Sequence, residues 1–338
     1  MYDDAADYVL RNEKLERFFN NNSVEFINEN KSSLQKYILK ELRELVKKFN
    51  FEKTNILDNK RSVGEEQVLY FDNLYNFKQY LNLTISKIIR KFFYVKFTVN
   101  SPSLLSREIA ERSGYFNTGC QNMLFVDELI KETITFEEYN EHILNNGVNN
   151  ILPFLKESKF VLSPAVCLHL YPQLEGKILE IEEKGYVAFD IIGQAYRDEG
   201  GNIDGKIRLN EFNVHEIVFF GGREKLTELS NEVLSFMFLI LDSLNILKNL
   251  EYSNDIFFGP QSESLLFSQA VGKSKIEAIG KQTLSSIASV NFHRKKFTEE
   301  YGIISKNADE ELESMCLAFG VDRIMEEMLL NDSFFILQ

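Results

Sequence analysis

Strand-like runs follow one another through the middle of the chain, with few helical segments between them. They cover residues 94–99, 123–126, 159–162, 186–192, 208–220, 273–279 and 284–292. A glycine-rich turn over residues 199–205 joins two of the longest runs and predicts a long hairpin. Many neighbouring strands with few helical crossovers are typical of an antiparallel sheet. The sequence therefore predicts an α+β fold, a mainly antiparallel sheet flanked by helices.

Residues 1–90 have the pattern of a helical region in front of this sheet. Within 33–49 and 81–93, apolar residues recur at spacings of three and four, which marks one buried helix face. A further helix is expected over 223–250, and residues 316–330 should begin as a strand and become helical at Gly320. We expect a helical N-terminal region, 1–90, and a larger domain, 91–338.

Charge and apolar content restrict where the protein works and what it binds. The 338 residues carry a net charge of −13, and the longest apolar stretch, 233–247, is interrupted by polar residues. With no basic-then-apolar leader, the chain is predicted to be cytoplasmic and free of membrane association. Its three cysteines are an odd and sparse count for a cytosolic chain, which indicates free thiols or metal ligands and not a disulfide framework. Because phosphate contacts dominate affinity for polyanions, the acidic balance argues against general tRNA binding.

One predicted strand carries an unusual set of side chains. Arg208, Phe212 and Glu216 are four residues apart and should share one strand face. A cation suits phosphate, an aromatic ring suits a purine, and a carboxylate suits an ammonium group or a metal. On periodicity alone, an ordinary surface hairpin with a half-buried phenylalanine is the commoner explanation.

Other single residues are ambiguous when taken alone. Arg323 follows the strand–helix joint at Gly320, where a surface arginine is common. Cys167 and Cys316 would most often be small buried apolar residues, and Cys120 a buried or free thiol. No pair of cysteines or histidines has zinc-finger spacing.

Taken together and in order, these segments resemble the three signature motifs of class II aminoacyl-tRNA synthetases. Residues 96–105, with Pro102, resemble motif 1, residues 197–216 motif 2, and residues 316–323 motif 3. A narrower resemblance is to the amino acid:[carrier protein] ligases, relatives of the zinc-dependent seryl-tRNA synthetases of methanogens. The strings that carry it span roughly residues 92–330 and are 112–116, 163–167, 171–172, 255–259, 275–277, 288–293 and 316–323.

The resemblance implies a role for individual residues in holding the metal and the amino acid. In that family a cysteine, a glutamate and a cysteine hold Zn²⁺, at positions that match Cys167, Glu216 and Cys316. The α-amino group of the substrate takes the open position on the zinc, and Asn291 and Ser289 lie near the amino acid. The amino acid is expected to be small, such as glycine or alanine.

The resemblance also implies an ATP site. Arg197 would neutralise the substrate carboxylate and the α-phosphate, whereas Arg208 and Arg323 would bind the β- and γ-phosphates. Phe212 would stack on adenine, and Glu199 would contact ATP near the base. Glu277, together with Ser289, would hold Mg²⁺ between the phosphates. Asp322 departs from the family pattern, which has glutamate before the motif 3 arginine, and this puts details of the ATP contacts in question.

The implied reaction is ATP-dependent activation of an amino acid to aminoacyl-AMP. The aminoacyl group then passes to the phosphopantetheine thiol of an acyl or peptidyl carrier protein. A homodimer through the motif 1 region around Pro102 is also expected. Two basic clusters, 87–91 and 294–296, are candidates for docking the acidic carrier, although solvated surface charge explains either one alone. Two alternatives remain: a short aminoacyl-tRNA synthetase that charges a tRNA, and an inactive synthetase paralogue that acts as a regulatory subunit.

Overall fold

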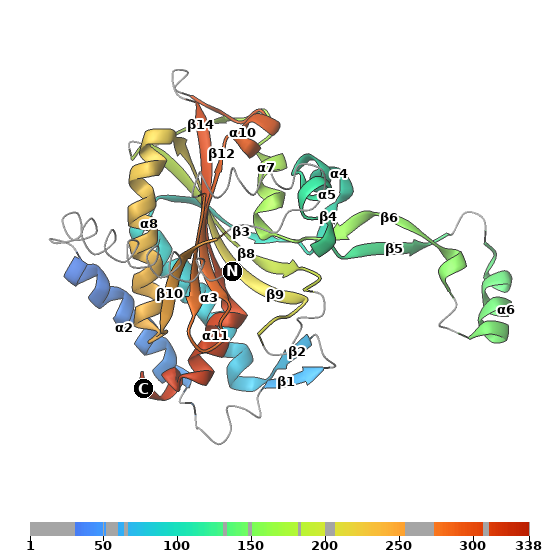
Figure 1. The fold of residues 1–338 in the computed structure, drawn as a ribbon, viewed down its shortest axis with the longest axis horizontal. Helices are drawn as coiled ribbons and strands as arrows, with labels where there is room; N and C mark the ends of the chain where they lie inside the picture. The colour runs from blue at the N-terminus through green and yellow to red at the C-terminus, as the bar shows by residue number, and fades with distance from the viewer. Residues whose placement is uncertain are drawn as a thin grey trace, which may run out of the picture.

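A single large sheet organises the molecule. The structure is a computed structural model that describes residues 31–49, 51, 60–63, 67–130, 134–147, 151–181, 184–199, 207–253, 274–306 and 311–337. The sheet has seven strands in the order β10-β11-β12-β14-β9-β8-β3 (Figure 1). The strands are β3 Val95–Ser101, β8 Tyr186–Tyr196, β9 Glu211–Gly222, β10 Lys248–Tyr252, β11 Lys275–Gly280, β12 Ser286–Arg294 and β14 Leu312–Gly320. All neighbours pair antiparallel except β3 and β8, which are parallel. The predicted α+β fold is confirmed.

Helices cover one face of this sheet. They are α2 Lys31–Phe49, α3 Asp72–Phe92, α8 Arg223–Ser243, α11 Val321–Leu330 and α12 Ser333–Ile336. Their apolar faces share one core with every second residue of the strands, for example Ile217 and Phe219 of β9. Because α2 and α3 are part of this core, the N-terminal region packs directly on the sheet.

The opposite face of the sheet has a second, smaller core. It is covered by the 3₁₀ helix Val166–His169, α7 Leu170–Gln173, α4 Arg107–Arg112 and α10 Lys296–Glu300. The alternate residues of β9 and β14, including Val218 and Cys316, point into this core. Alternate side chains of one strand thus point to opposite faces of the sheet. One is the face covered by α2, α3, α8, α11 and α12, called the helix-covered side, and the other contains the polar residues singled out from the sequence.

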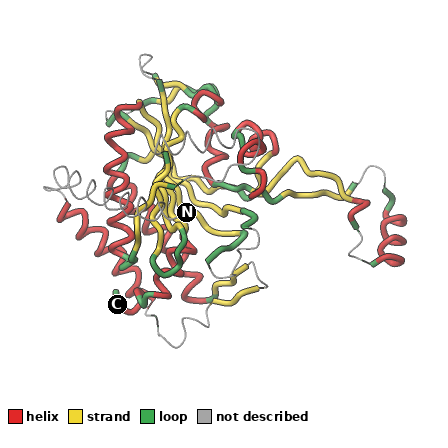
Figure 2. The backbone as a smooth tube through the Cα atoms, in the orientation of Figure 1, coloured by secondary structure: helices red, strands yellow, loops and turns green. Residues whose placement is uncertain are grey.

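A three-stranded sheet extends away from the body of the molecule (Figure 1). It contains β4 Leu104–Ser106, β5 Phe125–Leu129 and β6 Leu155–Leu162, and α6 Phe136–Asn146 lies at its far end. Helix α6 begins with a capping box, in which Thr135 and Glu138 each bond the backbone of the other. Figure 2 shows the same arm as a strand pair ending in a helix.

Some local predictions were wrong. The helix expected over 223–250 ends at Ser243, because Leu244 caps it and Asn245 adopts a positive φ of 56° that a helix cannot continue. Residues 248–250 then form part of β10. The region expected to be helical also contains a hairpin, β1 Lys60–Val63 with β2 Gln67–Tyr70.

The hairpin of β8 and β9 is confirmed by their antiparallel register from Tyr186↔Gly221 to Tyr196↔Glu211. Its turn at 200–205 and the string at 255–259 lie outside the described residues. No helix in the described part of the chain is long and apolar enough to cross a membrane.

Candidate active site

Two cysteine thiols and a glutamate carboxylate from distant parts of the chain meet on the face opposite the helix-covered side. These residues, Cys167, Glu216 and Cys316, form the buried acidic set. Cys316 of β14 pairs with Val218 of β9, and Ala318 pairs with Glu216, so Cys316 and Glu216 are neighbours on one face. Cys167 approaches them from the 3₁₀ helix Val166–His169. Cys167, Glu216 and Cys316 expose only 5%, 4% and 1% of their surface. The expected convergence of these residues is therefore present.

Burial and mutual contact dominate the electrostatics of this set. Burial raises the pKa of both thiols well above the ordinary value, and the charge of Glu216 raises it further. Both thiols donate hydrogen bonds to the Glu216 carboxylate. Burial also raises the pKa of Glu216, although these bonds and nearby Arg197 partly offset the increase. Three groups that ionise to anions are thus packed together with one nearby cation.

The chemistry of this set fits a bound divalent cation. Two thiolates and a carboxylate are ligands that Zn²⁺ accepts, and uncompensated anions are costly to bury. As the side chains stand, however, no group of three or more Cys, His, Asp or Glu in the described ranges has an arrangement that could hold a metal. Burial favours the protonated form of both thiols here, so metal uptake would require their deprotonation and a small rearrangement.

A second layer of polar side chains surrounds Cys316. The amide Nδ2 of Asn291 lies 3.4 Å from Cys316 Sγ and 3.1 Å from Ser289 Oγ. His293 Nε2 lies 3.5 Å from the same sulfur, and its Nδ1 lies 3.0 Å from the hydroxyl of Tyr171. Asn291 and Ser289 were expected here, whereas His293 and Tyr171 had not been assigned roles. The period-two spacing of residues 289, 291 and 293 along β12 is the signal that would have found His293.

An arginine–aromatic platform adjoins the acidic set. Two guanidinium groups approach the ring of Phe212 in β9, with Arg197 at 5.5 Å and Arg323 at 5.7 Å from its centroid. Arg197 Nε donates to the Pro164 carbonyl at 2.9 Å. Arg323 is held by the Ser286 carbonyl, which accepts from Nη1 at 3.0 Å. Burial lowers the pKa of Arg323 from its ordinary value, and the charges of Arg197 and Arg208 add to this effect, whereas the charge of Glu199 opposes it.

Two carboxylates lie at the edge of this platform. Glu199 faces two arginines, at 3.5 Å from Arg208 and 3.7 Å from Arg323. Glu277 pairs with Ser289 across β11 and β12 on the site face and forms an ion pair with Lys275 at 3.1 Å. Glu277 also acts on the charge of Arg323, which places it near the residues around Phe212.

The expected strand position of Arg208 was wrong. Strand β9 begins at Glu211, and Arg208 lies in the bend before it. Arg208 reaches the cluster through the Glu199 carboxylate and not through strand alternation. Phe212 and Glu216, by contrast, do share the face predicted for them.

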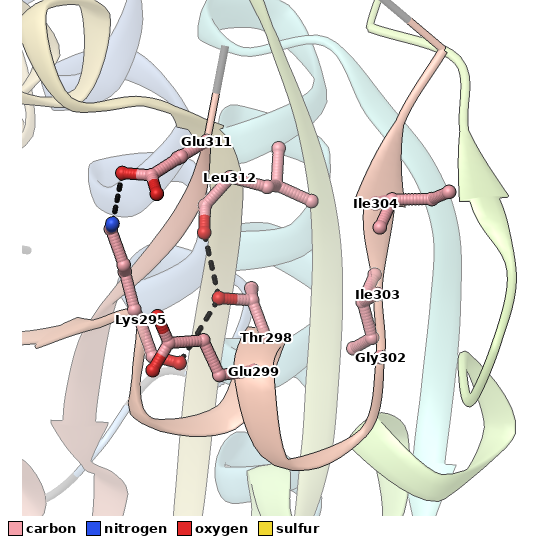
Figure 3. Close-up of a pocket in the computed structure, with 8 residues that line it drawn as sticks. All are labelled: Lys295, Thr298, Glu299, Gly302, Ile303, Ile304, Glu311 and Leu312. Carbon is pink, nitrogen blue, oxygen red and sulfur yellow. Dashed lines mark hydrogen bonds and ion pairs between the residues drawn. The ribbon is translucent and has the colours of Figure 1, made fainter. Parts of the chain in front are cut away.

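The two basic clusters considered for docking have local acidic partners. Arg294 pairs with Glu313 and Lys295 with Glu311, and Lys87 pairs with Glu41. Lys295 also borders a cavity of about 210 Å³ beside α10 (Figure 3). The cavity is lined by Lys295, Thr298, Glu299, Gly302, Ile303, Ile304, Glu311 and Leu312, and shares no residue with the candidate site.

Comparisons with known proteins identify ligases among the relatives of this chain. No protein-family model matches the sequence. The type-2 serine–tRNA ligase of Methanocaldococcus jannaschii is 26% identical over 185 residues, 54% of this chain and 35% of that protein. The amino acid–[acyl-carrier-protein] ligase 1 of Bradyrhizobium diazoefficiens is 26% identical over 240 residues, 67% of this chain and 69% of that protein. Homologues of the chain thus include ligases of both kinds.

Solved structures settle the architecture. A seryl-tRNA synthetase of M. kandleri, solved with A. aeolicus tRNASec, matches with a TM-score of 0.67 at 19% identity, over 80% of this chain and 55% of that one. The chain has the fold of the class II aminoacyl-tRNA synthetase catalytic core. A Pyrococcus horikoshii seryl-tRNA synthetase complexed with ATP matches with a TM-score of 0.59 at 12% identity, over 82% of this chain and 57% of that one. The chain spans between a third and a half of the methanogen ligases it matches, 35% and 47% in two cases.

Proposed function

We propose that this class II synthetase-like chain activates a small amino acid to aminoacyl-AMP and transfers it to the phosphopantetheine thiol of a carrier protein. The observation that carries the proposal is the junction at Arg197. Its guanidinium lies 5.5 Å from the centroid of the Phe212 ring, and its charge partly offsets the burial that raises the pKa of Glu216 in the buried acidic set. One arginine therefore connects the buried acidic set with a platform suited to a nucleotide.

The chain's own residues would act by positioning and by charge. The carboxylate oxygen of the amino acid attacks the α-phosphorus, and the bond to the pyrophosphate leaving group breaks. No general base is required, because the carboxylate is already ionised. Arg197 would compensate charge at the reacting centre, and Arg208 and Arg323 would bind the departing phosphates. Phe212 would stack on the adenine, and Glu199 would fix the nucleotide near its base.

Two cations are part of the proposal. Cys167, Glu216 and Cys316 would hold Zn²⁺, which would supply an open coordination position for the substrate amine. Glu277 with Ser289 would hold Mg²⁺ alongside the triphosphate. Asn291, which reaches towards Cys316, would line the space for the amino-acid side chain and favour a small one.

The two candidate functions differ in the molecule that accepts the aminoacyl group. The ligase from Bradyrhizobium diazoefficiens, which matches over 67% of this chain, favours a carrier protein. A net charge of −13 also opposes binding to a polyanion. A tRNA acceptor is the second candidate, because a structural neighbour was solved with tRNA and several relatives are serine–tRNA ligases. The prediction that tRNA is not the acceptor finds no support in those neighbours.

An exchange assay followed by an acceptor screen tests the proposal. Amino-acid-dependent ATP–pyrophosphate exchange should appear with one or a few small amino acids. The activated amino acid should then label a holo carrier protein and leave total tRNA unlabelled. Absence of exchange with every amino acid would favour the inactive paralogue, and labelled tRNA would favour the short synthetase.

A homodimer through motif 1 belongs to the same proposal. Strand β3 is an edge strand of the seven-stranded sheet, and Pro102 follows it in an exposed position. Phe97 on this strand exposes 57% of its surface, which is high for a large apolar side chain. Sedimentation of the protein should report a dimer, and Phe97→Glu should shift it towards the monomer.

A further inference from the structure

Asp322 is a buried carboxylate on the helix-covered side of the sheet. It exposes only 4% of its surface at the start of α11. Its Oδ1 accepts from Lys78 Nζ of α3 at 2.7 Å, and its Oδ2 accepts from the backbone N–H of Asn213 at 2.5 Å. The Tyr70 hydroxyl also donates to it, and burial together with this carboxylate raises the Tyr70 pKa well above its ordinary value.

The sequence neighbours of these groups are nucleotide-site residues. Asn213 directly follows Phe212 in β9, and Asp322 directly precedes Arg323 at the start of α11. Phe212 and Arg323 are the two residues whose contact of 5.7 Å forms one side of the platform. One carboxylate thus joins the strand that carries the ring to the helix that carries the guanidinium.

The remaining contacts of Asn213 make this junction rigid. Its side chain donates to the Gly193 carbonyl of β8 at 3.0 Å and accepts from Asn82 Nδ2 of α3 at 2.8 Å. Strand β9 is therefore fixed at this residue by β8, α3 and α11 together. Because the backbone is held at Asn213, the neighbouring side chain of Phe212 has a restricted position.

We infer that Asp322, with Lys78 as its counter-ion, is a positioning residue for the nucleotide site, an inference that rests on the proposed function. The carboxylate fixes the distance between Phe212 and Arg323 without touching ATP itself. Lys78 is the counter-ion that holds this carboxylate in place, because an unpaired buried charge is strongly destabilising. This assigns helix α3, in the N-terminal region, a part in nucleotide binding.

The variants Asp322→Asn and Lys78→Met test the inference. Asp322→Asn keeps the shape and removes the charge, whereas Lys78→Met keeps the apolar stem and removes the counter-ion. Glu326→Gln is the matched control, since Glu326 is another buried acid of α11 that pairs with a lysine of the N-terminal region, Lys60. Dissociation constants for MgATP are measured by calorimetry, with circular dichroism melting to confirm that each variant is folded at the assay temperature.

The two test variants should bind MgATP about 10- to 100-fold more weakly than the wild type. Glu326→Gln should lower the melting temperature while its MgATP dissociation constant stays within twofold of the wild type. Equal MgATP affinities in wild type and Asp322→Asn would overturn the inference and leave the proposed function intact. Equal weakening in Glu326→Gln would also overturn it, because the effect would then follow lost stability. A wild-type protein that fails to bind MgATP would remove the proposed function and this inference together.

Discussion

The substitution Asp190→Asn should destabilise the folded protein by about 3–5 kcal/mol at neutral pH, because it breaks a fully buried pair. Asp190 of β8 and His215 of β9 each expose 0% of their surface, and Oδ1 lies 2.6 Å from Nε2. The other carboxylate oxygen accepts from Ser86 at 2.6 Å and from Thr98 at 3.1 Å. An asparagine can reproduce the shape of this acceptor but not its charge.

The pH dependence of the effect has a defined sign. Burial opposes the charged form of Asp190, but the hydrogen bond and charge of His215, with the two hydroxyls, outweigh burial and lower its pKa. A lowered pKa in the folded state adds stability above the unfolded value, which is about 3.9 for aspartate. That stability is lost as the pH falls through the lower folded pKa. The difference between wild type and variant should shrink as the pH falls below about 4.

Urea unfolding of both proteins at several pH values between 3.5 and 7 measures this difference. Asp242→Asn is the matched control, since Asp242 pairs with Lys248 but leaves 59% of its side chain exposed. The control should lose less than about 1 kcal/mol. The reasoning would be refuted by a loss below 1 kcal/mol for Asp190→Asn at pH 7, or by a difference that grows as the pH falls below about 4.

Two further predictions concern the candidate site. Cys167→Ala or Cys316→Ala should lose bound zinc, measured by plasma mass spectrometry, together with pyrophosphate exchange, whereas Cys120→Ala, at an exposed thiol, should keep both. Full activity in either of the first two variants would contradict the metal assignment. Phe212→Leu should weaken MgATP binding by roughly tenfold, since stacking on a base is worth about 1–3 kcal/mol, and should leave the zinc content unchanged. Unchanged affinity in a calorimetric titration would show that the ring is not the adenine platform.

Local pattern predicted much of the sheet and the site. Alternation placed Phe212 and Glu216 on one strand face, and the β8–β9 register bears this out. The strand–helix joint at Gly320 was also predicted, because a strand pattern changes to a helical one at that glycine. The convergence of Cys167 with Cys316 could not come from spacing, since 149 positions separate them in the sequence. Only the ordered resemblance of several motifs indicated it.

Other features depend on tertiary contacts that no local pattern carries. Helix α8 ends at Ser243 because the chain must turn into β10, and the apolar pattern continues past that point. Asp322 was read as a departure in an ATP motif, whereas its partners Lys78 and Asn213 lie on the helix-covered side of the sheet. The residue that contacts Asp322 depends on how α3 packs against α11. A single sequence does not show which residues of two packed helices face each other.

The spacing along β9 leads to a last prediction, about which amino acids the site accepts. Phe212 and Glu216 are four residues apart on one strand, which corresponds to about 13–14 Å at 3.4 Å per residue. Strand β8 pairs with β9 over this whole span and β14 pairs with its Glu216 end, so the distance is held by the sheet. In the proposed function, the amine of the amino acid is held near Glu216 and the adenine of ATP lies on Phe212. The distance from that amine to the α-phosphorus at Arg197 is then fixed, and the carboxylate of the amino acid must match it. The best α-amino acid should therefore be favoured over its β-amino homologue by about 10- to 200-fold in pyrophosphate exchange, the usual value of one methylene. Equal rates for the two would mean that the amine is not anchored by the buried set.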